Sequence, residues 1–572
     1  MEPVRERRWK IAQPDPGLVE CLSRECSLSL LSAALLVNRG IERADAANSF
    51  LSSGLAGLHD PFLFLDMEKA VERLKVAIIH GERICVYGDY DVDGVTSVAL
   101  LTSFLRTLGA DCVYHIPNRL EEGYGLSAAG ITAVSEGGVR LIVTADCGIT
   151  ACAEAAFCTS LGIDLIITDH HTPSAEIPSA LAVINPLRTG CPFPCKSLAG
   201  VGVVFNLVIA LRTRLREAGF FETRAEPNLR EYLDLVALGT IADIVPLIDE
   251  NRILVSHGLR ELTAASRTGV RALKTVSGIS ADVDCGAVGF RLAPRLNAAG
   301  RLEDAASGVE LLLTDDVMLA TSLAQELNAS NEERQCLEQT IMLDALDKVK
   351  KDPAMASRKS IVLASESWHS GVIGIVASRL VDLYHRPTVL ISLEGENGKG
   401  SGRSIPGFHL HDALKACSEH LIRFGGHKYA AGLTVGLVDL QDFIERFDEI
   451  AAEVLLEEDL LPELRIDAEL SPEQVSLQTA DEVASLEPFG MGNPRPVFLL
   501  RSVRVVQQTI LKEKHVRLRL AAGGLSFEAI GFNLADGIPA GDTLDVAFCL
   551  DINDWNGKRS ARLRIKDMRE SV

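Results

Sequence analysis

Acidic and histidine side chains follow three apolar runs of the sequence, and each run is rich in β-branched residues. RICVYG is followed by DYDVDG, LIVTA by DCG, and DLIIT by DHH. Because the carboxyl ends of parallel strands meet at one edge of an open α/β sheet, we expect these segments to converge. A single Asp after a strand is usually a turn or cap residue. Three Asp within five residues instead predict a metal site, because such close charges repel one another unless a cation neutralises them.

The candidate ligands are carboxylates and imidazoles, with a further acidic position in ALGTIADIVPL: Asp89, Asp91, Asp93, Asp146, Asp169, His170, His171 and Asp243. Carboxylates with one or two imidazoles favour Mn²⁺ or Mg²⁺. No cysteine pair accompanies them, and Cys191 and Cys195 of CPFPC have no second pair nearby, so structural zinc is disfavoured. Two divalent ions close together can activate water and neutralise a phosphoryl oxygen. The residues therefore predict hydrolysis of a phosphate ester or anhydride.

The elements that position these residues belong to a chain of several domains, because 572 residues correspond to roughly three or four. Its composition, 47% hydrophobic and 24% charged, is that of a globular protein. No apolar run reaches the ~18 residues of a membrane span. The charged N-terminus MEPVRERRWK lacks the apolar core of a signal peptide. The 13 scattered cysteines indicate reduced thiols, so we expect a cytoplasmic protein.

The fold expected from the sequence is α/β followed by a β-barrel. Short β-branched runs alternate with helical stretches from residue 81, which predicts a parallel sheet. A segment without Gly or Pro predicts one long connecting helix, a second α/β pattern follows it, and five or six short strands at the end suggest a small closed barrel. The expected boundaries are a helical lead-in at 1–80, an α/β domain at 81–314, the connecting helix at 315–351, a second α/β domain at 352–457 and the barrel at 462–572.

Charge is unevenly distributed along the chain. The net charge is −21, yet residues 501–572 hold 12 Lys and Arg against 9 Asp and Glu. Within this segment Arg517 and Arg519 alternate, as do Arg562 and Arg564, so each pair lies on one face of a predicted strand. Two basic strand faces on a small barrel can bind a sugar–phosphate backbone. The alternative is that acidity serves solubility only and that the basic residues of the barrel are incidental.

The motifs resemble those of a known superfamily. GDYDVDG, TADCG and TDHH, in this order and spacing, resemble the first, third and Asp-His-His motifs of the DHH phosphoesterases, while NRLEEGYGLS resembles the second motif and LGTIADIVPL the fourth. RLAPRLNAAGRLEDA, GSGRSIPGFHL, RFGGHKYAAGLTV and EPFGMGNPRPVF are similar to segments of the RecJ family, so the resemblance spans roughly residues 70–570. It implies a DHH catalytic domain, a DHH-associated domain and an OB-fold. One departure is Val92, where the family often has Ala, and we expect it to alter packing only.

The resemblance also implies roles for individual residues. It assigns Asp93, Asp146, His170 and Asp243 as central metal ligands, Asp91 as a ligand of a second ion, and Asp89 and His171 as ligands or phosphate-positioning groups. Ser401, Arg403 and Arg119 match a pocket for a terminal 5′-phosphate, Gly425, Gly426 and His427 match a scissile-phosphate contact, and Arg295 and Arg301 match backbone contacts. Glycines allow backbone N–H groups to approach a phosphate, and an arginine adds a bidentate contact. The alternative for each arginine is a surface or domain-bridging ion pair.

The function that the resemblance implies is a 5′→3′ exonuclease specific for single-stranded DNA, acting in DNA repair and recombination. It would release 5′-mononucleotides through water activated by two Mn²⁺ or Mg²⁺ ions, with a single-strand-binding protein and a helicase as candidate partners. A phosphodiesterase for oligoribonucleotides or cyclic dinucleotides is the alternative, but it would not need a basic barrel. An inactive scaffold disagrees with the complete ligand set, and a pyrophosphatase disagrees with the length.

Overall fold

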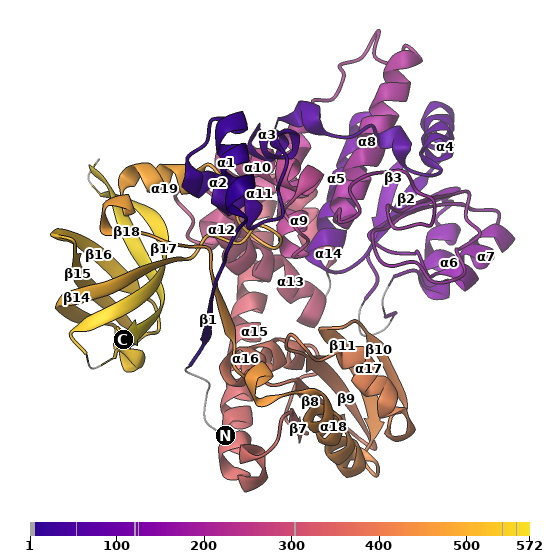
Figure 1. The fold of residues 1–572 in the computed structure, drawn as a ribbon. Coiled ribbons are helices and arrows are strands. Elements are labelled where there is room, and N and C mark those ends of the chain that lie inside the picture. Colours follow the sequence, from indigo (N-terminus) through magenta and orange to yellow (C-terminus); the bar gives the residue numbers. More distant parts are fainter. Residues whose placement is uncertain are drawn as a thin grey trace. The chain divides into compact units, whose positions relative to one another are not determined.

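The computed structural model describes residues 6–52, 54–118, 122–123, 125–302, 305–539, 541–555 and 558–571. These residues form two compact units. The N-terminal unit comprises the described residues of Pro14–Asn331 together with Asp481–Arg495. The C-terminal unit comprises those of Met1–Gln13, Glu332–Ala480 and Pro496–Val572. Figure 1 shows the elements of both units.

The N-terminal unit contains a parallel sheet of five strands in the order β3-β2-β4-β5-β6. The strands are β2 (Ile84–Gly88), β3 (Cys112–His115), β4 (Leu141–Ala145), β5 (Asp164–Thr168) and β6 (Ala182–Ile184). Successive side chains of β2 enter two different cores: Ile84 and Val86 join one apolar cluster, and Cys85 and Tyr87 join another. Helices cover both faces, which explains why these strands are continuously apolar rather than alternating.

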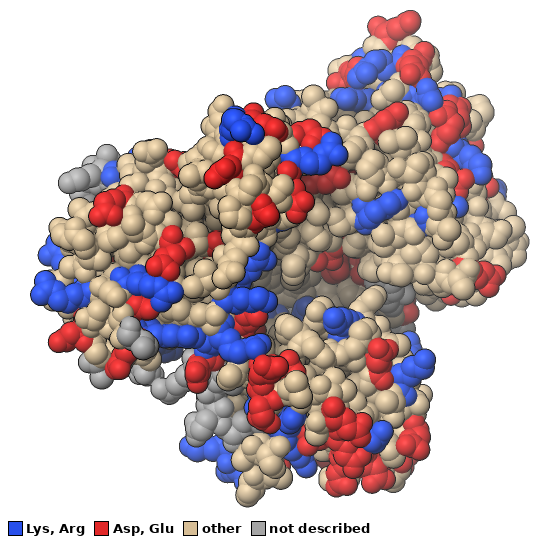
Figure 2. Space-filling view, viewed as in Figure 1, with Lys and Arg blue, Asp and Glu red and all other residues tan. Residues whose placement is uncertain are grey.

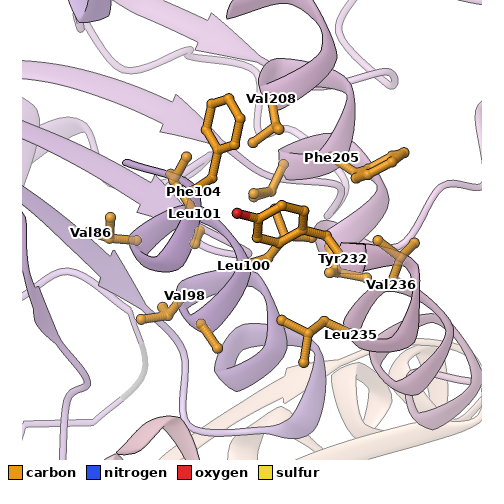
Figure 3. Close-up of a cluster of buried hydrophobic side chains, with 14 of the residues drawn as sticks. Val86, Val98, Leu100, Leu101, Phe104, Phe205, Val208, Tyr232, Leu235 and Val236 are labelled. Atoms are coloured by element: carbon orange, nitrogen blue, oxygen red, sulfur yellow. The ribbon is translucent and has the colours of Figure 1, made fainter. Parts of the chain in front are cut away.

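One of the two cores lies between the sheet and the three helices α5 (Val92–Thr107), α8 (Gly200–Glu217) and α9 (Leu233–Ala242). Figure 3 shows side chains of β2 and these helices, among them Val86, Phe104, Val208 and Leu235, meeting in this core. Burial of each such side chain contributes roughly 1.5–3 kcal/mol. The same packing fixes the first turns of α5 and α8, which adjoin the carboxyl ends of the strands.

The other helices in the described part of this unit surround this framework. They are α1 (Pro16–Cys26), α2 (Leu30–Val37), α3 (Ala44–Ser52), α4 (Met67–His80), α6 (Ala128–Glu136), α7 (Cys152–Ser160), α10 (Asp249–Ala264), α11 (Thr268–Val276), α12 (Cys285–Ala287), α13 (Ala293–Leu302) and α14 (Ala306–Leu313). The long helix expected at 315–351 is present as α15 (Val317–Lys351), and the division between the two units falls within it. No described helix is both long and apolar enough to cross a membrane.

The C-terminal unit contains a five-stranded sheet in the order β10-β11-β9-β8-β7. Its strands are β7 (Ile361–Ser365), β8 (Thr388–Glu394), β9 (Asn397–Arg403), β10 (Arg423–Gly426) and β11 (Ala430–Gly436), and its helices are α16 (Ile373–Tyr384), α17 (Leu410–Ala416) and α18 (Leu440–Val454). Only β7 and β8 pair in parallel, whereas the remaining strands are antiparallel. The second α/β region expected from the sequence is therefore present.

The C-terminal unit also contains the barrel. Its strands are β14 (Phe498–Leu511), β15 (His515–Ala522), β16 (Leu525–Gly531), β17 (Thr543–Trp555) and β18 (Lys558–Glu570). Because β14 pairs with both β15 and β17, the sheet closes on itself. The short strand β13 (Ala468–Glu469) pairs with β14, and α19 (Leu477–Ala484) lies between these two strands in the chain. The prediction of an α/β protein ending in a small closed barrel is confirmed.

The sequence pattern predicts a helical lead-in, but the structure shows that this region also contains a strand. Strand β1 (Arg8–Ile11) pairs in parallel with β12 (Glu463–Ile466), and Trp9 Nε1 donates a hydrogen bond of 2.7 Å to Asp567 Oδ2. Residues 464–466, which the sequence pattern placed in the barrel, therefore pair with β1, whereas the following strand β13 pairs with β14. Both differences arise from pairings between residues more than 400 positions apart, which local periodicity does not reveal. The domain boundaries stay predictions.

Candidate metal centre and phosphate-binding surfaces

Three buried aspartates follow the ends of three neighbouring strands. Gly88 at the end of β2 pairs with Ala145 at the end of β4, and β5 is the next strand of the sheet. Asp89, Asp146 and Asp169 come directly after these strands and are each exposed by 2% or less. Asp146 lies in the left-handed region with a φ of 67°, which turns the chain sharply at the sheet edge. The predicted convergence of the three motifs is therefore present in the structure.

The DYDVDG segment owes its shape to a helix start. Asp91 caps α5, because its Oδ1 accepts a hydrogen bond of 3.0 Å from the backbone N–H of Gly94. Asp93 lies in the first turn of the same helix. A Cβ on Gly94 would lie 2.5 Å from the carbonyl oxygen of Asp89, so only glycine allows this approach. The spacing of the three aspartates thus follows from a strand end, a cap and a first turn.

The N-terminus of α8 holds Asp93. The backbone N–H groups of Gly200 and Val201 donate to its two carboxylate oxygens over 2.6 and 2.8 Å. These contacts and the positive end of the helix dipole favour the ionised carboxylate. A Cβ on Gly200 would lie 2.5 Å from Asp146 Oδ1, and a Cβ on Gly239 would lie 2.9 Å from Asp93 Oδ1. Two glycines therefore make room for the two acidic side chains.

His170 points one ring nitrogen at three carboxylates. Its Nε2 lies 3.2 Å from Asp146 Oδ1, 3.6 Å from Asp243 Oδ2 and 3.8 Å from Asp93 Oδ2. Among the described residues, this buried nitrogen has no hydrogen-bond partner. An imidazole nitrogen surrounded by carboxylate oxygens at these distances fits a shared metal ion.

Asp169 has a different role from the one its residue type indicated. Its Oδ1 accepts hydrogen bonds from the backbone N–H groups of His170 and His171 and from His171 Nδ1, and its Oδ2 accepts from Ile149 N. Burial raises the pKa of Asp169, but these donors and the His171 charge outweigh it, and the net shift is downward. Asp169 is therefore an ionised acceptor that orients His171, rather than one of the grouped ligands.

Three sets of side chains bring ligand atoms within 4.8 Å of one another. The sets are Asp89, Asp91 and Asp146; Asp93, His170 and Asp243; and Asp146, His170 and His171. The first two share no residue, and the third overlaps both. Of the candidate ligands expected from the sequence, all but Asp169 belong to these sets, and the carboxylate-rich donors suit Mn²⁺ or Mg²⁺. The arrangement has donors for two neighbouring divalent ions, with Asp146 close to both.

The electrostatics of the cluster favour a cation. Burial and nearby carboxylates raise the pKa of Asp93 to about 6 and that of Asp243 to about 7, although His170 opposes both shifts. Burial and the charge of Asp93 likewise raise the pKa of Asp146 well above its ordinary value. Repulsion of this kind is relieved when a divalent ion supplies positive charge.

A second candidate surface lies on the sheet of the C-terminal unit. Ser401 and Arg403 share β9, and Arg403 Nη1 donates to Ser401 Oγ over 3.1 Å. The second residue of α16, Gly374, adjoins both side chains, since a Cβ there would lie 2.8 Å from Ser401 Oγ and 3.1 Å from Arg403 Nη2. A hydroxyl, a guanidinium and a helix N-terminus therefore meet at one place, which suits an anion.

A row of glycines extends from Ser401 across the sheet. Ser401 pairs with Gly432 on β11, and Gly432 pairs with Gly425 on β10. No atom lies within 4 Å of a Cβ placed on Gly425. Gly426 has a φ of 137°, and the N–H of the exposed His427 donates to Ala430 O. No described side chain therefore covers the backbone of the sheet at Gly425. The expected phosphate contact of His427 stays a prediction.

For the arginines predicted to bind phosphate in the N-terminal unit, the described contacts are structural ones. Arg119 lies outside the described residues. Arg295 Nε donates to Asn328 Oδ1 over 2.9 Å, and the backbone carbonyl of Arg291 accepts from Arg295 Nη1, so Arg295 is at least partly structural. Arg301 shares α13 with Arg295. A Cβ on Gly300 would lie 2.5 Å from the carbonyl oxygen of Tyr90, so α13 packs against the first motif.

The barrel carries its predicted arginines on two strand faces. Arg517 and Arg519 are exposed on β15, while Arg562 and Arg564 are half-buried on β18. Arg519 lies 3.6 Å from Glu528, and Arg564 lies 3.4 Å from Asp551. Figure 2 shows basic side chains interspersed with acidic ones on the visible face of the barrel. The basic faces are therefore present, but acidic neighbours partly balance them.

Sequence reasoning missed several contributors to the site. The α8 backbone amides and the glycines at 200 and 239 were not identified, although AGVG at the start of an apolar helix is a signal for a helix N-terminus that contacts an anion. The orienting role of Asp169 was also missed. Its position inside TDHH did not distinguish a ligand from the residue that orients a ligand.

Comparison with known proteins agrees with this architecture. Residues 83–240 match the N-terminal domain of the DHH family, residues 358–453 the DHHA1 domain and residues 466–567 the RecJ OB domain. The single-stranded-DNA-specific exonuclease RecJ of Bacillus subtilis is 39% identical over 568 residues, covering 98% of this chain and 70% of that protein. The Escherichia coli protein of the same name is 42% identical over 521 residues, covering 88% of this chain and 90% of its own.

Solved structures of similar fold also match nearly the whole chain. The crystal structure of RecJ from Thermus thermophilus in complex with Mn²⁺ matches with a TM-score of 0.84 at 34% identity, covering 99% of this chain and 80% of that chain. Its complex with Mg²⁺ matches with a TM-score of 0.79. The chain therefore belongs to the RecJ family.

Proposed function

We propose that the chain is a metal-dependent exonuclease that degrades single-stranded DNA from the 5′ end and releases 5′-mononucleotides. The observation that carries the proposal is the pair of ligand sets that share no residue. His170 Nε2 of one set lies 3.2 Å from Asp146 Oδ1 of the other, so the two sets adjoin. When bound, two Mn²⁺ or Mg²⁺ ions would supply the Lewis acidity that activates water for in-line attack on the phosphodiester.

The protein's own side chains would fix the geometry of that attack. Asp89 and Asp91 with Asp146 would hold one ion, and Asp93, His170 and Asp243 the other. Asp169 holds the Nδ1 of His171, so the opposite nitrogen of that ring faces away from Asp169 and can contact a phosphate oxygen. Buried surroundings strengthen each of these interactions, because little water competes for the charged groups.

Polarity would come from the surface around Ser401. We assign Ser401, Arg403 and the N-terminus of α16 to the terminal 5′-phosphate, together with Arg119. The open glycine row beside Ser401 supports this role, because a phosphate can approach the backbone there without meeting any described side chain. His427 would contact the scissile phosphate. Arg295 and Arg301 are assigned to the DNA backbone.

The barrel would hold the strand beyond the cleavage site. Arg517 and Arg519 on β15 and Arg562 and Arg564 on β18 would bind phosphates electrostatically, which does not require a particular base sequence. A role in repair and recombination, a cytoplasmic location, and association with a single-strand-binding protein and a helicase belong to the same proposal.

The proposal is tested with single- and double-stranded oligonucleotides of one sequence, labelled at either end and incubated with Mn²⁺. We expect mononucleotides from the 5′ end of the single strand and little digestion of blunt duplex. Asp146→Ala should abolish cleavage while the protein stays folded. Equal digestion of both substrates, or cleavage by Asp146→Ala, would refute the proposal.

Point variants test the barrel better than deletion does. Residues Asp481–Arg495 belong to the N-terminal unit, so removal of everything after residue 461 would also take away part of that unit. A double variant, Arg517→Ala with Arg562→Ala, should weaken cleavage of long strands and leave hydrolysis of dinucleotides unchanged. Equal losses on both substrates would indicate a damaged fold, and unchanged cleavage of long strands would indicate a small-substrate phosphodiesterase instead.

A further inference from the structure

A strained loop carries the metal ligand Asp243. The loop joins α9 to α10, and the residue after the ligand, Ile244, has a φ of 62° although it is β-branched. Its side chain is 66% exposed, so its own burial contributes little to holding this conformation. A β-branched residue adopts the left-handed region only when surrounding contacts impose it. Something outside the loop must therefore hold it.

The contact that holds the loop comes from residues 489–493, which we call the FGMGN segment. Its central carbonyl, Met491 O, accepts a hydrogen bond of 2.7 Å from Leu247 N in the loop. The two glycines beside Met491 lie directly against the loop. A Cβ on Gly490 would lie 2.7 Å from Leu247 Cδ1, and a Cβ on Gly492 would lie 3.0 Å from Pro246 Cβ.

The FGMGN segment is itself fixed by buried polar contacts. Gly490 and Asn493 exchange backbone hydrogen bonds, and the fully buried Asn493 side chain donates to the carbonyls of Leu486 and Pro488. Arg39 Nε donates to Asn493 Oδ1 over 2.8 Å. Because these hydrogen bonds hold both ends of the turn, the position of Met491 O is fixed and does not shift with the loop.

Arg252 anchors the chain that leads into this turn. Its guanidinium, 2% exposed, donates to the carbonyls of Phe50, Leu486 and Glu487. One residue earlier on α10, Asn251 Nδ2 donates to Pro246 O and to Ser197 O, just before the α8 amides that hold Asp93. The loop of Asp243 and the support of Asp93 are therefore joined by the same helix.

We propose that the FGMGN segment is a positioning element of the metal centre, which holds the loop of Asp243 so that the carboxylate meets His170 and Asp93 before any ion binds. Gly490, Gly492 and Asn493 are positioning residues, since none of them is a ligand. The inference rests on the proposed function. Residues that orient metal ligands typically contribute about 10–100-fold to metal affinity.

The test measures Mn²⁺ affinity by titration of Gly492→Ala and Gly490→Ala, alongside the activity of each variant as a function of Mn²⁺ concentration. We expect Mn²⁺ to bind about 10–100-fold more weakly, with turnover recovering at saturating Mn²⁺ and the KM for DNA unchanged. Gly162→Ala is the matched control. Gly162 has a similar φ of 70° against 73° for Gly492, and no atom lies within 4 Å of its added Cβ. Its Mn²⁺ affinity should equal that of the wild type.

Folded Gly492→Ala or Gly490→Ala protein with wild-type Mn²⁺ affinity would overturn the inference. If Gly492→Ala fails to fold, Gly490→Ala carries the test, because its added Cβ meets side-chain atoms that can shift. Hydrogen exchange of the wild type gives an independent result: the Leu247 amide should be protected without Mn²⁺, and exchange that slows only after Mn²⁺ is added would refute the inference. A wild type that binds Mn²⁺ but does not cleave DNA would contradict the proposed function alone.

Discussion

Replacement of Asp169 by asparagine tests whether this residue orients the metal centre. Asp169→Asn keeps the shape of the side chain and removes its charge. Oδ1 accepts three hydrogen bonds, from His170 N, His171 N and His171 Nδ1, whereas Oδ2 accepts one, from Ile149 N. The amide therefore keeps its oxygen on the His side and turns its NH₂ group toward the N–H of Ile149. Two buried donors then face each other.

The magnitude follows from these four contacts. An unsatisfied buried donor costs about 1–3 kcal/mol. The three remaining hydrogen bonds lose the assistance of the charge, roughly 0.5–1 kcal/mol each, and the lower desolvation cost of a neutral amide offsets part of this loss. We expect the free energy of unfolding to fall by about 2–4 kcal/mol. Exonuclease activity should fall about 10–100-fold, because His171 loses its orienting partner.

The assay is urea denaturation together with cleavage of a labelled single strand. Asp164→Asn is the matched control, since Asp164 begins the strand β5 that Asp169 follows, is half-exposed and pairs with Arg73. Such a pair is worth only about 0–1 kcal/mol, so this control should change stability little and leave cleavage unchanged. Asp169→Asn protein with wild-type stability and full activity would refute the orienting role.

Three further results are expected. Gly374→Ala should lower the preference for 5′-phosphorylated over 5′-hydroxyl strands in competition assays without changing Mn²⁺ affinity, and an unchanged preference would exclude the α16 pocket. Mn²⁺ at one hundred times its Kd should raise the free energy of unfolding by about 2.7 kcal/mol; Asp146→Ala should lose most of this gain in thermal denaturation, and retention of the gain would place the ions elsewhere. Arg517→Ala should weaken single-strand binding and reduce the slope of log affinity against log salt by about 0.7 in anisotropy titrations, whereas an unchanged slope would remove that arginine from the interface.

Local patterns were sufficient to predict that the candidate metal ligands lie close together. Asp89 and Asp146 follow strands, and Asp91 and Asp93 start α5, whereas Asp243 follows the end of α9. Strands and helix starts have short sequence signatures: β-branched runs for the strands, and an aspartate three residues before glycine for the start of α5. The rule that parallel strands place their carboxyl ends together then brought the motifs to one edge. The long helix and the closed barrel followed from equally local patterns.

Contacts between distant segments were not predictable in this way. The α8 amides that hold Asp93 lie over 100 positions from it, and the FGMGN segment lies over 240 positions from the loop it contacts. β1 and β12 are further apart still. In each case the decisive interaction is a backbone hydrogen bond, which any residue type except proline can donate. Only the glycines that allow close approach leave a trace in the sequence.

The central claim, that two divalent ions lie between the strand-end carboxylates, is tested most directly by anomalous diffraction from crystals soaked in Mn²⁺. We predict two anomalous peaks from two Mn²⁺ ions. One ion is bound by Asp89, Asp91 and Asp146, and the other by Asp93, His170 and Asp243. Absence of both peaks from this cluster in crystals of protein that digests single-stranded DNA with Mn²⁺ would contradict the claim.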